Sequence, residues 1–220
     1  TTLNGEGLQH EDGHSLVMAN TIPNCKSYDP TYNYELAVII QDGMQRMYVD
    51  KENCFYYVTT MNENYRHPEM PKGVEEGIIK GIYRLDKGKS KKKLRVQLMG
   101  SGTILREVEA AADILRNDFN VEADVWSVTS VNYLTQQLVD AKGPVVAATD
   151  YIKMHFEQLR DFIPAPLTVL GTDGFGRSDS REQLRRFFEV NRYYVVIAAL
   201  RALVDDGSVK ASVVTKAIQR

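Results

Sequence analysis

The sequence is poor in cysteine, in long hydrophobic runs and in excess charge of either sign. Its two cysteines, Cys25 and Cys54, lack C-x-x-C spacing, which argues against a disulfide framework and against a zinc site. No apolar run approaches the length of about 20 residues that spans a bilayer. The 27 basic and 29 acidic side chains give a net charge of −2, so no overall field favours nucleic acid or an anionic membrane. We therefore expect a cytoplasmic protein with no nucleic-acid or membrane partner.

The composition is that of a globular protein with a large core. Of the 220 residues, 43% are hydrophobic and 25% are charged, and a chain of this length buries about 70% of its unfolded surface on folding. The sequence begins at Thr1, with neither an initiator methionine nor a charged-then-apolar leader. We therefore expect this chain to be a piece of a longer protein.

The first part of the sequence predicts a strand, a helix and a second strand. Residues 20–28 have an extended character that ends at a proline turn. Apolar side chains between 34 and 47 recur at spacings of three and four, which predicts a helix with one buried face. Residues 54–61, CFYYVTTM, are dense in aromatic and β-branched side chains, which is typical of a short buried strand.

A stretch with few apolar residues separates this part from the rest. Residues 62–73 contain Pro68 and Pro71, so regular structure should stop there. We predict a boundary between two domains, which would comprise residues 1–66 and 67–220.

The remaining sequence alternates between strand and helix patterns. Strands are predicted at 94–99, 121–130, 143–150 and 167–172, and helices at 103–115, 149–163, 193–204 and 209–218. Thr149 or Asp150 is the predicted N-cap of the second helix. Such alternation predicts an α/β fold, with a mostly parallel sheet flanked by helices on both faces.

Several polar segments are better explained by structure than by binding. The basic run Lys87–Arg95 has no interleaved aromatics and predicts a solvated loop. The turn MGSGTILREV after the strand at 94–99 could favour an anion, but Leu105 stands at the third glycine of G-x-G-x-x-G, which favours a plain tight turn. His67 and His155 stand alone and are interpreted as ordinary surface or cap residues.

The loop GTDGFGRSDSR, residues 171–181, has two interpretations. It could bind an anion through Arg177 and backbone N–H groups. It could instead form a rigid bend in which Ser180 or Asp179 caps the following helix, and we favour this structural role.

The segment NGEGLQHEDGHS, residues 4–15, is the strongest candidate for chemistry. A metal site would need His10 and His14 on one face of a helix, and Gly13 between them argues against a helix. An acid–base site needs one imidazole near neutral pKa and a carboxylate to orient it, which His10 and Glu6 could supply. From the residues alone, a solvated polar loop is an equally good interpretation.

Three motifs in this order resemble a known enzyme family. GEGLQHEDGHS (5–15), MNENY (61–65) and GTDGFGRSDSR (171–181) are similar to segments of the thiamine diphosphate-dependent decarboxylating component of the bacterial pyruvate dehydrogenase complex, in its homodimeric form. The resemblance covers essentially the whole chain. It implies the end of a pyrimidine-binding middle domain followed by a transketolase-like C-terminal domain.

The resemblance also implies an activity and a role for each site residue. The family decarboxylates pyruvate on thiamine diphosphate with Mg²⁺ and passes the two-carbon unit to a lipoyl group of the acetyltransferase component. By this likeness, His10 faces the substrate-derived group and moves a proton, Glu6 orients and tunes the imidazole, and Gln9 and Asp12 assist. The family's cofactor-binding motifs lie upstream of this chain, so we expect the chain alone to be inactive.

Two departures and two alternatives accompany the resemblance. Leu16 stands where relatives often carry a histidine, and relatives usually have an additional stretch between Leu134 and Thr135. The first alternative is that the chain serves only in dimerisation and assembly. The second is that it belongs to a related 2-oxo acid dehydrogenase or a transketolase.

Overall fold

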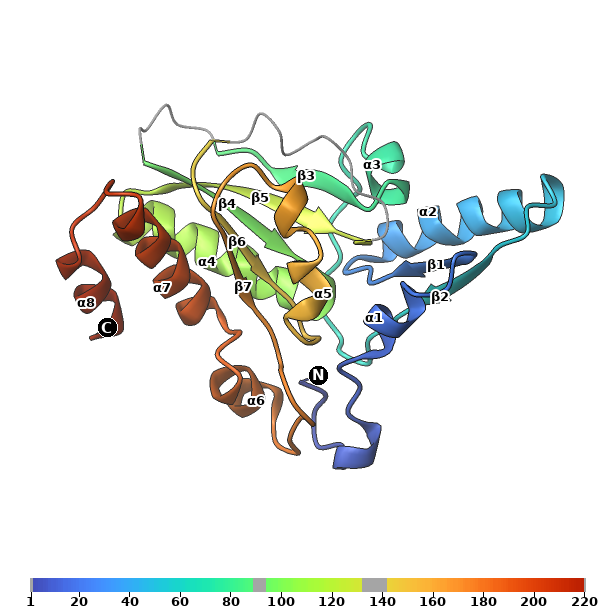
Figure 1. Ribbon diagram of the computed structural model, residues 1–220, viewed down its shortest axis with the longest axis horizontal. Coiled ribbons are helices and arrows are strands. Elements are labelled where there is room, and N and C mark those ends of the chain that lie inside the picture. Colours follow the sequence, from blue (N-terminus) through green and yellow to red (C-terminus); the bar gives the residue numbers. More distant parts are fainter. Residues whose placement is uncertain (1, 89–93, 132–141, 220) are drawn as a thin grey trace.

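The chain forms two regions, each built on its own sheet (Figure 1). The computed structural model describes residues 2–88, 94–131 and 142–219. A parallel pair, β1 (Cys25–Tyr28) and β2 (Phe55–Val58), forms the first sheet. The second sheet has five strands in the order β3-β5-β4-β6-β7. No helix among the described residues is long and apolar enough to cross a membrane.

The first region surrounds its two strands with short helices and one long helix. The helices are η1 (Leu8–His10), α1 (Ser15–Ala19), α2 (Asn33–Met44) and the π-helix η2 (Gln45–Val49) that continues α2. The predicted helix at 34–47 is therefore confirmed. Of the extended segment predicted at 20–28, only the last four residues form a strand, because residues 20–24 turn after α1.

The predicted burial of the second strand is wrong. Phe55 and Tyr57 in β2 are 42% and 37% exposed. Aromatic and β-branched residues fit any pleated surface, whether or not another layer covers it. In this structure β2 pairs with β1, and one of its faces remains open to solvent.

The second region confirms the predicted α/β fold. Strands β4 (Arg95–Gly100), β6 (Val145–Ala148) and β7 (Leu167–Leu170) are parallel to β5 (Glu122–Val128) or to one another, and β3 (Ile82–Asp86) is antiparallel to β5. The sequence analysis missed β3 and the short helix α3 (Glu75–Ile79) that precedes it. Both lie in residues 75–86, a stretch for which the sequence analysis predicted no element.

Helices cover both faces of the five-stranded sheet, as predicted (Figure 1). The 3-10 turn η3 (Gly102–Ile104) leads into α4 (Leu105–Asp118), which packs on one face with α7 (Arg192–Asp205), while α5 (Met154–Glu157) and η5 (Arg160–Phe162) cover the other. Two further helices, α6 (Arg181–Phe187) and α8 (Ser212–Ile218), flank α7 in the chain. In β6, Val146 and Ala148 face the first core, whereas Val145 and Ala147 face the second.

The helix predicted at 149–163 is wrong in its first half. Residues 149–153 cross the carboxyl end of the sheet without regular structure, and Lys153 is the N-cap of α5. Neither Thr149 nor Asp150 caps a helix. Asp150 instead binds the backbone N–H of Thr2 at 2.9 Å, a partner 148 residues away that helical periodicity cannot reveal.

Predictions for the isolated histidines and the glycine loop have mixed outcomes. His155 is not a surface residue, because it is only 2% exposed under the sheet. His67 acts as a cap, because its Nδ1 accepts a hydrogen bond from the N–H of Asn33 in the first turn of α2. Ser180 caps α6 through its hydroxyl, which accepts from the N–H of Gln183 at 3.4 Å. The central residues of the basic run, 89–93, and the junction at Leu134 and Thr135 lie outside the described residues.

Candidate active site

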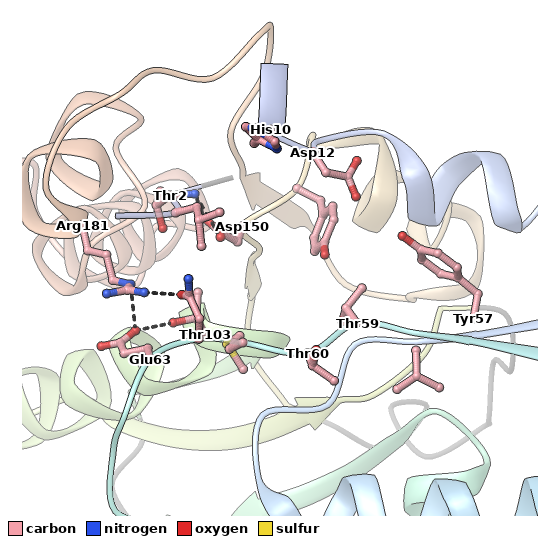
Figure 2. A pocket seen from close by; sticks show the side chains of 15 residues that line it. Thr2, His10, Asp12, Tyr57, Thr59, Thr60, Glu63, Thr103, Asp150 and Arg181 are labelled. Atoms are coloured by element: carbon pink, nitrogen blue, oxygen red, sulfur yellow. Dashed lines mark hydrogen bonds and ion pairs between the residues drawn. The ribbon is translucent and has the colours of Figure 1, made fainter. Parts of the chain in front are cut away.

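The three motifs that carry the resemblance meet at one cavity of about 330 Å³ (Figure 2). It lies where the first region meets the carboxyl ends of β4 and β6, which are followed by the lining residues Thr103, Asp150 and Tyr151. This is the edge at which α/β sheets usually bind ligands. One imidazole, His10, lines the cavity. Its other polar lining consists of the hydroxyls of Thr2, Tyr57, Thr59, Thr60, Thr103 and Tyr151, the carboxylates of Asp12, Glu63 and Asp150, and the side chains of Asn62 and Arg181.

His10 is the most available acid–base group of this cavity. It ends the 3-10 turn η1, its side chain is exposed, and Figure 2 shows it on the side of the cavity opposite Thr60. Among the described residues, no hydrogen bond engages its imidazole. Both ring nitrogens are therefore free to exchange a proton with a bound molecule.

Glu6 is the predicted partner of His10. Its carboxylate is half-buried and is not part of the cavity lining. Within the described residues, no hydrogen bond or ion pair joins Glu6 to His10. Pairing of these two groups stays a prediction.

The other polar residues of the first motif shape its backbone. The Asp12 carboxylate accepts hydrogen bonds from the N–H groups of His14 and Ser15, both at 3.0 Å, and also contacts the Ser15 hydroxyl. These bonds satisfy donors at the start of α1, as a capping residue does. His14 is exposed and is not part of the cavity lining. Gln9 is exposed as well.

Asp150 fixes the start of the first motif from below the cavity. Both of its carboxylate oxygens accept from the N–H of Thr2, at 2.9 and 3.0 Å. Burial raises the pKa of this carboxyl above its ordinary value. The sequence analysis assigned Asp150 to a helix cap and missed this role. Its position directly after a parallel strand was the available signal.

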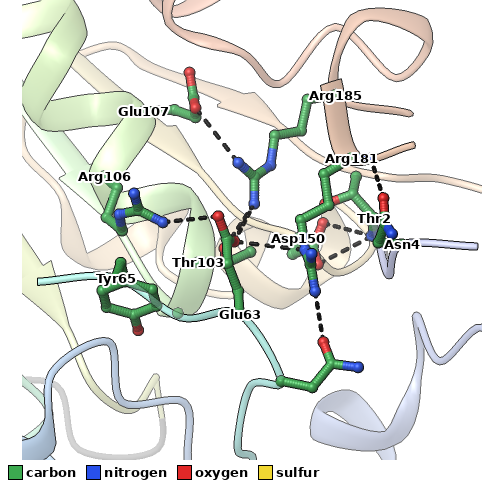
Figure 3. Close-up of polar contacts among 12 residues, drawn as sticks. Thr2, Asn4, Glu63, Tyr65, Thr103, Arg106, Glu107, Asp150, Arg181 and Arg185 are labelled. Atoms are coloured by element: carbon green, nitrogen blue, oxygen red, sulfur yellow. Dashed lines mark hydrogen bonds and ion pairs between the residues drawn. The ribbon is translucent and has the colours of Figure 1, made fainter. Parts of the chain in front are cut away.

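A network of buried charges holds the MNENY segment against the second region (Figure 3). The Glu63 carboxylate accepts hydrogen bonds from Arg106 and Arg185, both at 2.9 Å, and from the Thr103 hydroxyl at 3.0 Å. Burial would raise the pKa of Glu63, but the charge and hydrogen bonds of Arg185 outweigh it and hold that pKa below its usual value. Glu63 therefore stays ionised and anchors the linker that leads out of the cavity.

The segment GTDGFGRSDSR, residues 171–181, contributes Arg181 to the same network. Its guanidinium donates to the Asn62 side chain at 2.5 Å and lies 3.5 Å from Glu63, and its backbone N–H donates to Asn4 at 3.2 Å. Arg177 stacks on the Phe187 ring at 5.6 Å. Because both arginines have protein partners, the structural interpretation of this loop is the better one.

The glycine turn after β4 encloses a carboxylate of the protein itself. Gly102 has a φ of +47°, and a Cβ there would lie 2.6 Å from a carboxylate oxygen of Asp29. Thr59 donates to Asp29 at 2.6 Å, and burial raises the pKa of this acid to about 6. The Asp29 carboxylate thus fills the space in front of the first turn of η3.

Comparisons with known proteins agree with the resemblance. The family described as the pyruvate dehydrogenase E1 component middle domain matches residues 1–68, and the transketolase-like C-terminal domain matches residues 81–191. A pyruvate dehydrogenase E1 component from Pseudomonas aeruginosa is 55% identical over 245 aligned positions, which cover 100% of this chain and 28% of that protein. One from Escherichia coli K12 is 53% identical and covers 100% of this chain and 27% of that protein.

The fold is that of a transketolase. The structure of the transketolase from Leishmania mexicana matches with a TM-score of 0.72 at 17% identity, and the match covers 91% of this chain and 28% of that one. The chain therefore belongs to the transketolase-like family and, within it, to the pyruvate dehydrogenase E1 components. It spans about a quarter of the length of these curated relatives.

Proposed function

We propose that this chain supplies an acid–base histidine to the active site of a pyruvate dehydrogenase that decarboxylates pyruvate and transfers the acetyl group to a lipoyl acceptor. The observation that carries the proposal is the unpaired imidazole of His10, held at the mouth of a polar cavity where all three family motifs meet. The high identity to pyruvate dehydrogenase E1 components supports pyruvate as the substrate rather than a ketose or another 2-oxo acid.

His10 would move protons at the reacting group. Its side chain reaches the cavity from a short 3-10 turn, and no protein group competes for either nitrogen in the described structure. It would donate a proton to the oxygen of the substrate-derived group, or accept and return one at the lipoyl sulfur. A positioned acid or base of this kind accelerates a reaction by roughly 10² to 10⁴-fold. Glu6, Gln9 and Asp12 would assist.

Thiamine diphosphate and Mg²⁺ are the cofactors that this function requires, and thiamine diphosphate would supply the carbanion-stabilising chemistry. The described residues do not fit its diphosphate end. No group of three or more His, Cys, Asp or Glu side chains among them could hold a metal ion, and the Asp29 carboxylate fills the glycine turn that leads into η3 and α4. We therefore propose that other parts of the enzyme bind the cofactor and that this chain alone is inactive.

The oligomeric state, the compartment, the partner and the domain boundary belong to the same proposal. We propose that the enzyme works as a homodimer in the cytoplasm and receives the lipoyl domain of the acetyltransferase component at this cavity. The domain boundary that we propose between residues 66 and 67 lies close to residue 68, where the match to the middle domain ends.

A second candidate function rests on an exposed apolar surface. Ile40, Met44, Tyr48 and Val49 on α2 and η2 are 50% to 68% exposed and line a shallow hollow. Such a patch is typical of an interface. It favours a role in assembly, with the chemistry wholly elsewhere.

The His10→Ala variant of the full-length enzyme separates the two functions. Single-turnover decarboxylation and lipoyl acetylation are followed separately, and we expect a loss of at least about 100-fold in one or both. Loss in acetylation alone assigns the proton to the lipoyl sulfur. The matched control is His14→Ala, which removes an exposed imidazole outside the cavity and should change neither rate more than about twofold. Equal rates for both variants would refute the acid–base role and leave assembly.

A further inference from the structure

The segment that carries His10 is held in place by the second region. At its start, Asp150 binds the N–H of Thr2. Further along, the N–H of Gly5 donates to the carbonyl of Asp179 at 2.9 Å. After His10, the carbonyl of Gly13 accepts from the N–H of Ile152 at 3.1 Å. The backbone between Thr2 and Gly13 is therefore bound to the second region at three points.

The glycine loop 171–176 supports both ends of this segment. The N–H of Thr172 donates to the carbonyl of Tyr151 at 2.9 Å, and its hydroxyl donates to the carbonyl of Asp150 at 2.5 Å. A Cβ on Gly171 would lie 2.7 Å from the Tyr151 carbonyl oxygen, so a glycine is needed for this approach. The loop thus fixes the backbone that presents Asp150 to Thr2.

Gly176 makes the closest approach to the catalytic segment. A Cβ built on it would lie 2.8 Å from the Cβ of Glu11, the residue that directly follows His10. Two carbon atoms do not pack at that distance. A side chain at position 176 therefore requires the glycine loop and the residue after His10 to move apart.

Gly174 in the same loop offers a control within the molecule. Its φ of +90° resembles the +78° of Gly176, so alanine meets a similar conformational penalty at both positions. A Cβ on Gly174, however, meets no atom within 4 Å. Gly174 is exposed, whereas Gly176 is buried against the His10 segment, so the Gly174 variant carries the backbone penalty without the contact.

We propose that the glycine loop 171–176 positions His10, with Gly176 as the positioning residue that sets the end of its turn through Glu11. The effect on catalysis rests on the proposed function, whereas the contact between Gly176 and Glu11 does not. Gly176 lies outside the cavity lining and touches no reacting group. Its effect on chemistry passes entirely through the placement of the imidazole.

The test compares Gly176→Ala with Gly174→Ala in the full-length enzyme. Misplacing a catalytic group by about 1 Å can cost roughly 100-fold in rate. We expect Gly176→Ala to lower kcat by roughly 10- to 100-fold while KM for pyruvate and Tm stay equal to those of Gly174→Ala. Hydrogen exchange of residues 4–14 should rise in the first variant and not in the second. Equal kcat and equal exchange in the two variants would overturn the proposal.

Two further measurements keep the outcomes separable. If His10→Ala leaves activity unchanged while Gly176→Ala still raises exchange in 4–14, the proposed function fails and the positioning contact stands. If His10→Ala abolishes activity but the two glycine variants match, the positioning inference alone fails. Where Gly176→Ala does not fold, adding Glu11→Gly removes the opposing Cβ and should restore the behaviour of Glu11→Gly alone. Failure of that rescue also overturns the proposal.

Discussion

The two regions differ in how their parallel strands are covered. In the second region, strands β4 and β6 lie between α4 and α7 on one face and α5 on the other, and their residues are buried on both faces. In the first region, the β1–β2 pair leaves Phe55 and Tyr57 exposed, and α2 presents an uncovered apolar side. Parallel sheets are normally covered on both faces, and two strands alone are only marginally stable. The first region therefore depends on its neighbours for order.

Buried polar groups join the first region to the second. Glu35, at the start of α2, is fully buried. Its carboxylate accepts from the N–H groups of Thr31 and Tyr32 and from the hydroxyls of Tyr83 and Ser127, which belong to β3 and β5. The second region thus rests on two large apolar cores, whereas the first combines these buried hydrogen bonds with a smaller apolar cluster around Tyr28 and Ile39.

The largest expected effect comes from the apolar core of the second region. Leu105→Ala removes a fully buried side chain of α4 and should lower the free energy of unfolding by about 3 to 5 kcal/mol, because a cavity remains. Ile40→Ala in α2 is the matched control, since Ile40 is 50% exposed, and should cost less than about 1 kcal/mol. Denaturant unfolding of both variants measures the difference. Equal losses would mean that the two regions are covered alike.

The next effect tests the polar junction. Glu35→Ala leaves two hydroxyls and two N–H groups without an acceptor and should cost about 3 kcal/mol. We expect hydrogen exchange to rise in α2 and β1 before it rises in α4. Glu75→Ala, at an exposed position of α3, should stay within about 0.5 kcal/mol. A uniform rise in exchange across both regions would contradict a separable first region.

Acid should weaken the second region through His155. Burial lowers its pKa to about 4 from an ordinary 6.5. Between these two pH values the unfolded chain therefore binds a proton at His155 and the folded chain does not. Stability from this group is present above pH 6.5 and should fall as the pH drops to 4, by roughly 3 kcal/mol in total. His155→Phe should lack this slope. Thermal unfolding at pH 7 and 4 measures it, and an unchanged slope in the variant would refute the assignment.

The smallest effect is an opposite slope from Asp29 in the first region. Burial raises its pKa from 3.8 to about 6, so the folded state binds the extra proton. The contribution to stability is present below pH 3.8 and should be lost as the pH rises past 6, by somewhat less than about 3 kcal/mol. The same unfolding series on Asp29→Asn should show this loss removed. If the contribution of Asp29 to stability rose with pH, as that of His155 does, the buried protonated state of Asp29 would be contradicted.

The sequence predicted elements well where a local pattern and the tertiary environment agree. The helix at 34–47 and strands β4 to β7 follow from apolar spacing, and Ser180 follows from capping chemistry. Prediction failed where a distant partner decided the structure. Asp150 accepts a hydrogen bond from the N–H of Thr2 and does not cap a helix, and β2 is exposed because no layer covers it. The local hydrophobic pattern carries no information about either of these two causes.

The sequence by itself determined the α/β class, because hydrophobic period is a local property. Its residues left the segment around His10 open between an acid–base site and a polar loop, and the resemblance to a known family favoured the acid–base site. The sequence also supplied the three motifs without indicating that they meet. Only the tertiary structure decided that Glu63, Arg181 and Asp150 line one cavity together with His10, while Glu6 stays outside the cavity lining. It likewise decided which glycine touches the catalytic segment. These are contacts between residues far apart in the chain, and they exist only once packing of the two regions has fixed the distances between them.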